Sequence, residues 1–89
     1  MQYLAIKNAG SFPCISVYID DEIVFSDIIK DSTSDYIPIT SGSFALKIFD
    51  NREKLRFDSW LSAAPNKSTL ITVNDNGIFT SSAPFPLFL

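Results

Sequence analysis

Acidic side chains are the residues of this 89-residue chain whose types and spacing could do chemistry. The densest run is Asp20-Asp21-Glu22, which offers carboxylates for a calcium ion or for a catalytic acid–base pair. Successive side chains of a strand point to opposite faces, and a turn spreads them further apart, so these carboxylates do not converge. We interpret the run as the solvated tip of a β-hairpin, with weak calcium binding as the alternative.

A second polar run, Asn74-Asp75-Asn76-Gly77, resembles part of an EF-hand loop. Such a loop would begin at Thr72 and end at Ala83, so it lacks both the first acid and the bidentate Glu that closes the site. The residue types are those of a tight turn, and we predict a hairpin here. We therefore predict no metal site, and three scattered glycines predict no phosphate loop and no cofactor site.

Nucleophilic and acid–base catalysis find little support in the composition. The chain contains no histidine, which removes the commonest general base and every imidazole ligand. Cys14 is the only cysteine, so neither an internal disulfide nor a thiolate metal cage can form. Its neighbours Pro13 and Ile15 supply no positive charge to activate the thiol, and we interpret Cys14 as a small buried apolar side chain. The alternative is an intermolecular disulfide or a reactive thiol. We predict that the chain is not an enzyme.

The charge balance excludes one large class of partners. Seven Lys and Arg residues face ten Asp and Glu residues, for a net charge of −3. Nucleic-acid binders need clustered basic residues to displace counterions from phosphates, so we expect no nucleic-acid partner. A transmembrane helix needs about 20 consecutive apolar residues, and no run in the sequence is that long. The first residues do not have the pattern of a signal peptide. The compartment is left open.

The apolar residues that must form the scaffold alternate with a period of two along almost the whole chain. Turn-forming residues interrupt this pattern at intervals of about ten residues, which is typical of sandwiches and small barrels. The segments that we expect to be strands are 3–8, 15–19, 22–29, 36–39, 43–50, 55–61, 68–73 and 78–80. The prediction is one domain over residues 1–89, an all-β, immunoglobulin-like antiparallel β-sandwich of about seven to eight short strands.

Three details of this strand map can be checked. The segment 22–29 carries apolar residues on both faces, so we expect it to be covered on both sides. Pro38 cannot donate to a ladder, which places the segment 36–39 at a sheet edge. Leu55, Phe57 and Leu61 are expected to share the core face of their strand.

Aromatic residues are the candidate contact residues. Alternation places Tyr3, Tyr18, Phe49 and Trp60 on the face opposite the core residues of their strands. Exposed rings on a sheet face can stack on sugars or bind a partner protein. The alternative is that the register differs by one residue, or that another segment covers these rings.

The C-terminal residues form a second candidate contact. Pro84 and Pro86 hold this segment extended, so that Phe85 and Leu87 (with Leu89) share one side and Phe88 lies on the other. Side chains of this size are costly to leave in water. We expect the segment to cover the aromatic face of its own sandwich, or that of a neighbouring chain and so form a homo-oligomer.

Three stretches of the chain carry a resemblance to a known family. They are Asn8-Ala9-Gly10-Ser11-Phe12-Pro13 with Ser16-Val17-Tyr18-Ile19-Asp20-Asp21, Ser34-Asp35-Tyr36-Ile37-Pro38-Ile39 with Gly42-Ser43-Phe44-Ala45-Leu46-Lys47-Ile48, and Pro65-Asn66-Lys67 with Leu70-Ile71-Thr72-Val73. In this order, over about residues 2–79, the chain resembles the DUF4397 family of bacterial β-sandwich domains. It departs from that family's pattern at Asp21, where a glycine is usual, at Ser16, where an aspartate is usual, and after Gly77, where the pattern is shortened.

The resemblance implies an immunoglobulin-like sandwich, often exported and often found in cell-envelope or spore-associated proteins, with no established activity and no catalytic residues to carry over. Two hypotheses of function follow. The first is a non-catalytic structural or protein-interaction module, with a protein partner or a second copy of the chain, possible in a bacterial cell envelope or spore layer. The alternative is a sandwich that binds a carbohydrate or another small ligand on exposed rings, with Trp60, Tyr18 and Tyr3 as the platform.

Overall fold

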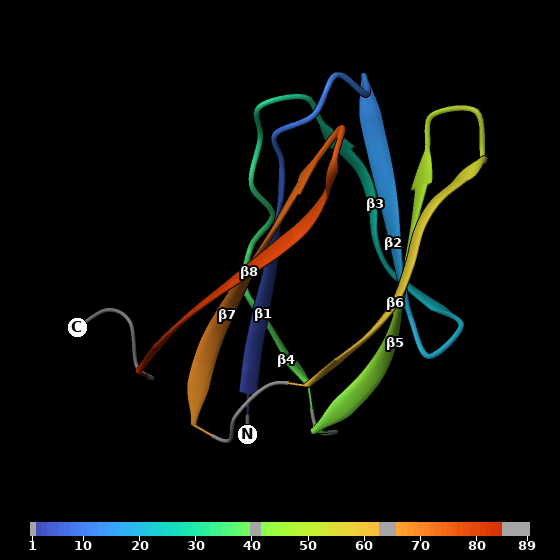
Figure 1. Cartoon of the computed structure of the whole chain (residues 1–89). Helices are drawn as coiled ribbons and strands as arrows, with labels where there is room; N and C mark the ends of the chain where they lie inside the picture. The colour runs from blue at the N-terminus through green and yellow to red at the C-terminus, as the bar shows by residue number, and fades with distance from the viewer. Residues whose placement is uncertain (1, 40–41, 63–65, 85–89) are drawn as a thin grey trace.

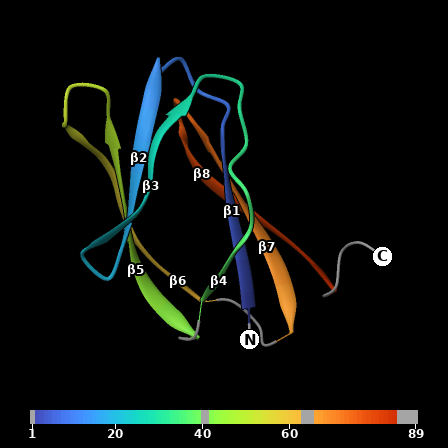
Figure 2. The same ribbon diagram turned by 180° about the vertical axis from the view of Figure 1, so that it is seen from behind.

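The structure is a computed structural model that describes residues 2–39, 42–62 and 66–84. It contains eight strands: β1 (Gln2–Asn8), β2 (Cys14–Ile19), β3 (Glu22–Ile29), β4 (Ile37–Ile39), β5 (Ser43–Asp50), β6 (Leu55–Ser62), β7 (Lys67–Asn74) and β8 (Gly77–Pro84). The strands form two four-stranded sheets, in the orders β4-β1-β7-β8 and β3-β2-β5-β6, which face each other (Figures 1 and 2). The predicted all-β sandwich is confirmed.

One pair of neighbouring strands departs from the antiparallel pattern. β1 and β7 run parallel at the centre of their sheet, from Tyr3 opposite Ser68 to Asn8 opposite Val73. Parallel neighbours cannot be joined by a tight turn, and five other strands separate these two in the chain. Alternation in the sequence shows which residues face the core, but it does not show which distant strands become neighbours.

The core lies between the two sheets and follows from the alternation. On β2, for instance, Ile15, Val17 and Ile19 point inward, while Cys14, Ser16 and Tyr18 point outward. Burial of one such aliphatic side chain contributes roughly 1.5 to 3 kcal/mol, so this pattern fixes which face of each strand is inside. The buried apolar cluster consists of Leu4, Ile6, Ile15, Val17, Ile19, Ile28, Phe44, Leu46, Ile48, Ile71 and Val73.

The turn between β2 and β3 is the predicted hairpin tip. Asp20 and Asp21 have φ angles of 51° and 68°, as both central residues of a type I′ turn require. Their carboxylates contact the neighbouring strand β5. The Asp20 Oδ1 atom accepts a hydrogen bond from the Ala45 N–H at 3.0 Å, and Asp21 Oδ1 lies 3.2 Å from Lys47 Nζ.

The expected position of 22–29 is wrong. Strand β3 pairs with β2 alone and lies at a sheet edge, and its side chains Ile23 and Ile29 are 52% and 60% exposed. The pairing of β2 with β3 contains two register shifts, and Asp27 has a φ of 55°. Each shift moves the following side chains to the other face, so apolar residues on both faces mark a bulged edge strand here rather than a covered one.

A similar irregularity corrects the expected position of Leu55. In the β5–β6 ladder Ile48 is opposite Phe57, but Phe49 is opposite Leu55, so Arg56 has no counterpart on β5. Leu55 therefore points away from the core and is 43% exposed. Phe57 and Leu61 contact the core cluster, as the alternation predicts.

The remaining edges are formed by β4 and β8. Strand β4, with Pro38, pairs only with β1, which confirms its edge position. Strand β8 follows the hairpin at Asn74–Gly77 and pairs with β7 as far as Pro84, so it is longer than the predicted 78–80. Within the residues that the structure describes, no helix is long and apolar enough to span a membrane.

Candidate functional site

The candidate site is the outer face of the sheet β3-β2-β5-β6, which we call face B. Strand pairing brings side chains from all four strands to it, because cross-strand partners point to the same side of a sheet. Tyr18 is paired with Ile23, and Phe49 with Leu55. The exposed large apolar side chains on this face are Ile23, Ile29, Leu55 and Trp60.

Trp60 is the most exposed large apolar side chain in the described part of the chain, at 73%. It lies on the edge strand β6, directly opposite Ala45 on β5. A methyl group is too small to cover an indole from the neighbouring strand. The ring therefore stands on the sheet surface with most of its area in water.

Tyr18 and Phe49 form an aromatic pair in the middle of face B. Their ring centroids are 5.1 Å apart with an interplanar angle of 67°, which is an edge-to-face arrangement. The register explains the contact, because Ser16 is opposite Phe49 and Tyr18 is opposite Lys47, which makes the two rings diagonal neighbours. Such pairs are worth about 0.5 to 1.5 kcal/mol beyond burial of area, so both rings are held in place.

A hollow of about 370 Å³ lies beside this pair. The two rings come from β2 and β5, and the serine hydroxyls come from β2 and β3. The carboxylates come from the bulged strand β3, the last residue of β5 and the β5–β6 turn. Asp27 and Glu53 are both held at positive φ, 55° and 61°. The lining residues are Ser16, Tyr18, Ile23, Ser26, Asp27, Phe49, Asp50 and Glu53. The hollow thus combines flat apolar rings with hydroxyl and carboxylate groups.

Asp50, at the end of β5, is a structural anchor. Its Oδ1 accepts hydrogen bonds from the N–H groups of Arg52 at 2.8 Å and Lys54 at 3.0 Å, and its Oδ2 accepts one from Arg56 Nε at 2.9 Å. The pKa of Asp50 is lowered, chiefly by the hydrogen bond from the Lys54 N–H. The Arg52 N–H and the Arg56 guanidinium also lower it, whereas burial of the carboxylate opposes the shift. Asp50 is consequently committed to closing the β5–β6 turn.

Arg56 connects this turn to the β1–β2 loop. The carbon at the centre of its guanidinium lies 5.3 Å from the centroid of the Phe12 ring, which is a cation–π distance. Arg56 is the residue without a counterpart on β5, so the register shift at this point directs its side chain to Asp50 and Phe12.

Cys14 lies on face B, half-buried, rather than in the core. Its Sγ is 3.7 Å from Asp27 Oδ1 and can donate to it. Burial, and after it the negative charge of Asp27, raises the pKa of the Cys14 thiol. The thiol therefore stays protonated at neutral pH, which is the opposite of what an activated nucleophile needs.

The remaining aromatic candidates do not join face B. Tyr3 lies on β1, in the other sheet, opposite Pro38 and Ser68. A platform of Trp60, Tyr18 and Tyr3 is therefore wrong, because alternation shows that each ring points outward but not from which sheet. Phe85, Leu87 and Phe88 lie outside the described residues.

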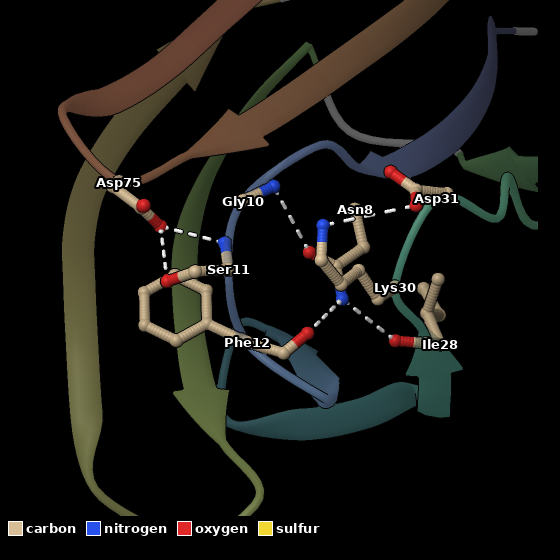
Figure 3. A network of polar contacts seen from close by, with 8 residues as sticks. All are labelled: Asn8, Gly10, Ser11, Phe12, Ile28, Lys30, Asp31 and Asp75. Carbon is tan, nitrogen blue, oxygen red and sulfur yellow. Dashed lines mark hydrogen bonds and ion pairs between the residues drawn. The ribbon is translucent and has the colours of Figure 1, made fainter.

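The motif around Asn8 is part of the scaffold (Figure 3). Asn8 is fully buried, and its Nδ2 donates to the carbonyl oxygens of Phe12 and Ile28, both at 3.1 Å. Its Oδ1 accepts a hydrogen bond from the Gly10 N–H at 3.3 Å. One side chain thus joins the end of β1, the β1–β2 loop and β3.

Asp75, in the β7–β8 turn, holds the same loop from the other side (Figure 3). It accepts hydrogen bonds from the Ser11 N–H at 2.8 Å and the Ser11 hydroxyl at 2.9 Å, and these two groups lower the pKa of Asp75. A Cβ atom on Gly10 would lie 2.9 Å from Asp75 Oδ1, so a larger residue here would displace the carboxylate that holds Ser11. Asn74 Oδ1 accepts from the N–H groups of Asn76 and Gly77, which confirms the hairpin turn.

No family model, curated protein or solved structure matches this chain. The resemblance to the DUF4397 family stays a prediction. Among the described residues, no three His, Cys, Asp or Glu side chains are grouped closely enough to hold a metal ion.

Sequence reasoning missed two features of the site. Leu55 and Ile23 reach face B only because of bulges, which leave no clear signal in an alternating pattern. The hollow is lined in part by Ile23, Ser26 and Asp27 of the bulged strand β3. The one available signal was Asp27 in an otherwise apolar strand, because aspartate is among the residues that tolerate a left-handed conformation.

Proposed function

We propose that this chain is a non-catalytic interaction module that binds a protein partner through face B. The observation that carries the proposal is the position of Trp60, which is 73% exposed in the regularly paired part of β6 and lies on the same face as Tyr18 and Phe49. An indole has only two side-chain torsions, so it loses little conformational entropy when a partner covers it. Trp and Tyr are the residue types that most often dominate protein–protein binding energy.

The surroundings of the rings support a partner surface of ordinary composition. Lys47 lies between Tyr18 and Asp58 in the ladder, with its ammonium group beside Asp21. Charged groups among aromatic and aliphatic side chains resemble the mixed core and rim of non-obligate interfaces. Such a face offers apolar area to a partner and charged groups around it.

The non-catalytic part of the proposal rests on the titratable groups of face B. Asp50 is occupied by three donors, and the environment of Cys14 favours the protonated thiol. Neither group is arranged as a base or a nucleophile. A bacterial cell envelope or spore layer is the setting that the DUF4397 resemblance implies, and we include it in the proposal.

The proposal is tested by co-purification from cells of the source organism. The tagged wild-type chain, Trp60→Ala and Phe79→Ala would be compared by quantitative mass spectrometry. Phe79 is the matched control, because it is 55% exposed but lies on β8 of the other sheet. We expect a protein that is enriched with the wild type and with Phe79→Ala and is lost with Trp60→Ala. Equal enrichment with all three chains would contradict the proposal.

The hollow favours a second candidate, the binding of a carbohydrate. It places the rings of Tyr18 and Phe49 beside the hydroxyls of Ser16 and Ser26 and the carboxylate of Asp27. Sugars bind on such combinations, with the ring faces against C–H groups and the polar groups on the hydroxyls. NMR titration with a panel of soluble oligosaccharides tests this candidate. Shifts confined to these residues, and abolished by Tyr18→Ala, would support it, whereas unchanged spectra for the whole panel would exclude those sugars.

A further inference from the structure

The four sheet edges of the sandwich are not equally protected. An edge strand exposes unpaired N–H and C=O groups, and natural proteins block these with short strands, Pro, bulges or charges. β4 has three residues and contains Pro38. β3 is interrupted by two register shifts and carries Asp27 at positive φ. β6 carries Arg56 and Asp58.

Strand β8 has none of these protections before its last residue. It is eight residues long, and its ladder with β7 runs from Asn74 opposite Gly77 to Lys67 opposite Pro84 without a register shift. It contains no Lys, Arg, Asp or Glu, and neither does the rest of the sequence after it. Its second side faces no strand of the described chain.

Residues 80–82 of β8 are also exposed on both faces of the sheet. Thr80 and Ser82 point to the same face as Ile78, which packs against the core, yet both are exposed. Ser81 points to the other face and is exposed as well. Figures 1 and 2 show why, because β8 diverges from β5 and β6 towards its C-terminal end. Within residues 2–39, 42–62 and 66–84, approach to this edge is therefore open from both sides.

We propose that β8 pairs with β8 of a second copy, antiparallel and around a two-fold axis, so that two β4-β1-β7-β8 sheets become one continuous sheet. In antiparallel pairing, every second residue directs its N–H and C=O groups to the neighbour, so one contact satisfies the free groups of both edges. The absence of charge selects this occupant. Two chains of net charge −3 repel each other. Among the edge strands that the structure describes, β8 is the long one without a charged residue, so two copies can meet there without placing like charges opposite each other.

Phe79 adds apolar contact to this pairing. It is 55% exposed on the outer face of β8, opposite Thr72 of β7. Side chains of paired strands share a face, so in a two-fold arrangement centred near Thr80 or Ser81 the ring would lie against outer-face residues of the second copy. This surface is separate from face B, and the proposal stands or fails independently of the proposed function.

Sedimentation equilibrium of the 89-residue chain, at concentrations up to about 1 mM, tests the proposal. We expect a monomer–dimer equilibrium. Ser81→Lys introduces two ammonium groups that lie opposite or diagonal to each other, and should weaken the dimer about fivefold or more. Ser62→Lys is the matched control, since Ser62 is also an exposed serine of an eight-residue edge strand, and it should leave the dimer unchanged. Melting of the dilute Ser81→Lys chain would verify that it still folds.

Hydrogen exchange of the wild type provides the second readout. Alternate amides of β8 should exchange more slowly as the protein concentration rises. A monomer at every concentration would overturn the proposal. A dimer that Ser62→Lys weakens as much as Ser81→Lys would also overturn it, and would place the contact on the other sheet.

Discussion

Trp60 and Ala45 face each other across the β5–β6 ladder, so the largest side chain of the sheet stands beside one of the smallest. The consequence is an indole that is 73% exposed although it lies in the regularly paired part of β6. An exposed side chain contributes little to the free energy of unfolding. Substitution of Trp60 should therefore affect the binding of a partner without a large change in the stability of the fold.

We expect Trp60→Ala to change the free energy of unfolding by no more than about 0.5 kcal/mol, as for other exposed positions. Phe44→Ala is the contrasting variant, because Phe44 is 1% exposed in the core, and it should cost about 3 to 5 kcal/mol. Urea denaturation monitored by circular dichroism measures both. If Trp60→Ala lowered the free energy of unfolding by more than about 1.5 kcal/mol, the indole would be part of what stabilises the fold.

The contrast between Trp60 and Leu55 shows how far the sequence leads. Alternation places Trp60 outward and Phe44 inward, because the period of two is determined by the pleat. Leu55 is misplaced by the same rule, since the bulge at Arg56 reverses the face and leaves no sign in the residue types. Tyr3 points outward as expected. The sheet to which it belongs is determined by the pairing of β1 with β7, which joins residues more than sixty positions apart. Local patterns do not contain such long-range pairings.

Asn8 should be the most sensitive polar residue of the scaffold. Asn8→Ala removes the donor to two carbonyl oxygens and the acceptor for the Gly10 N–H in a fully buried position. Unsatisfied buried groups of this kind cost about 1 to 3 kcal/mol each. We expect Asn8→Ala to lower the free energy of unfolding by about 3 kcal/mol, as measured by chemical denaturation. Asn76→Ala, in an exposed turn position, is the control, and a similar loss for both variants would refute the role of Asn8.

The stability of the chain should depend on pH through Asp50. Its pKa is lowered in the folded state, so its contribution is present above the unfolded value, near 3.8, and is lost as pH falls through the folded pKa. We expect Asp50→Asn to lower the melting temperature at pH 7, and the difference from wild type to narrow below about pH 4. Asp58→Asn, exposed on the neighbouring strand, is the control. A difference that stays constant down to pH 2 would show that the charge of Asp50 is not involved.

Asp21→Gly should stabilise the β2–β3 hairpin. Both turn residues have positive φ, which glycine adopts without the penalty of a Cβ atom, while the exposed Asp21–Lys47 ion pair contributes little. The expected net gain is about 0.5 kcal/mol in denaturant unfolding. Asp20→Gly should stabilise the chain less, because it also removes the carboxylate that accepts a hydrogen bond from the Ala45 N–H. Destabilisation by Asp21→Gly would mean that the ion pair outweighs the relief of backbone strain.

Site-specific photo-crosslinking tests the use of face B as a binding surface most directly. A benzophenone amino acid would replace Trp60 in one version of the chain and Phe79 in another, and both would be irradiated in cells of the source organism. These residues are comparably exposed large rings on different sheets, so non-specific collisions label both. We expect one defined adduct with another protein from position 60 that is absent from position 79. The only specific adduct expected from position 79 is with a second copy of the chain, through the proposed β8 pairing. The same adducts from both positions, or none from position 60, would contradict the binding of a partner on face B.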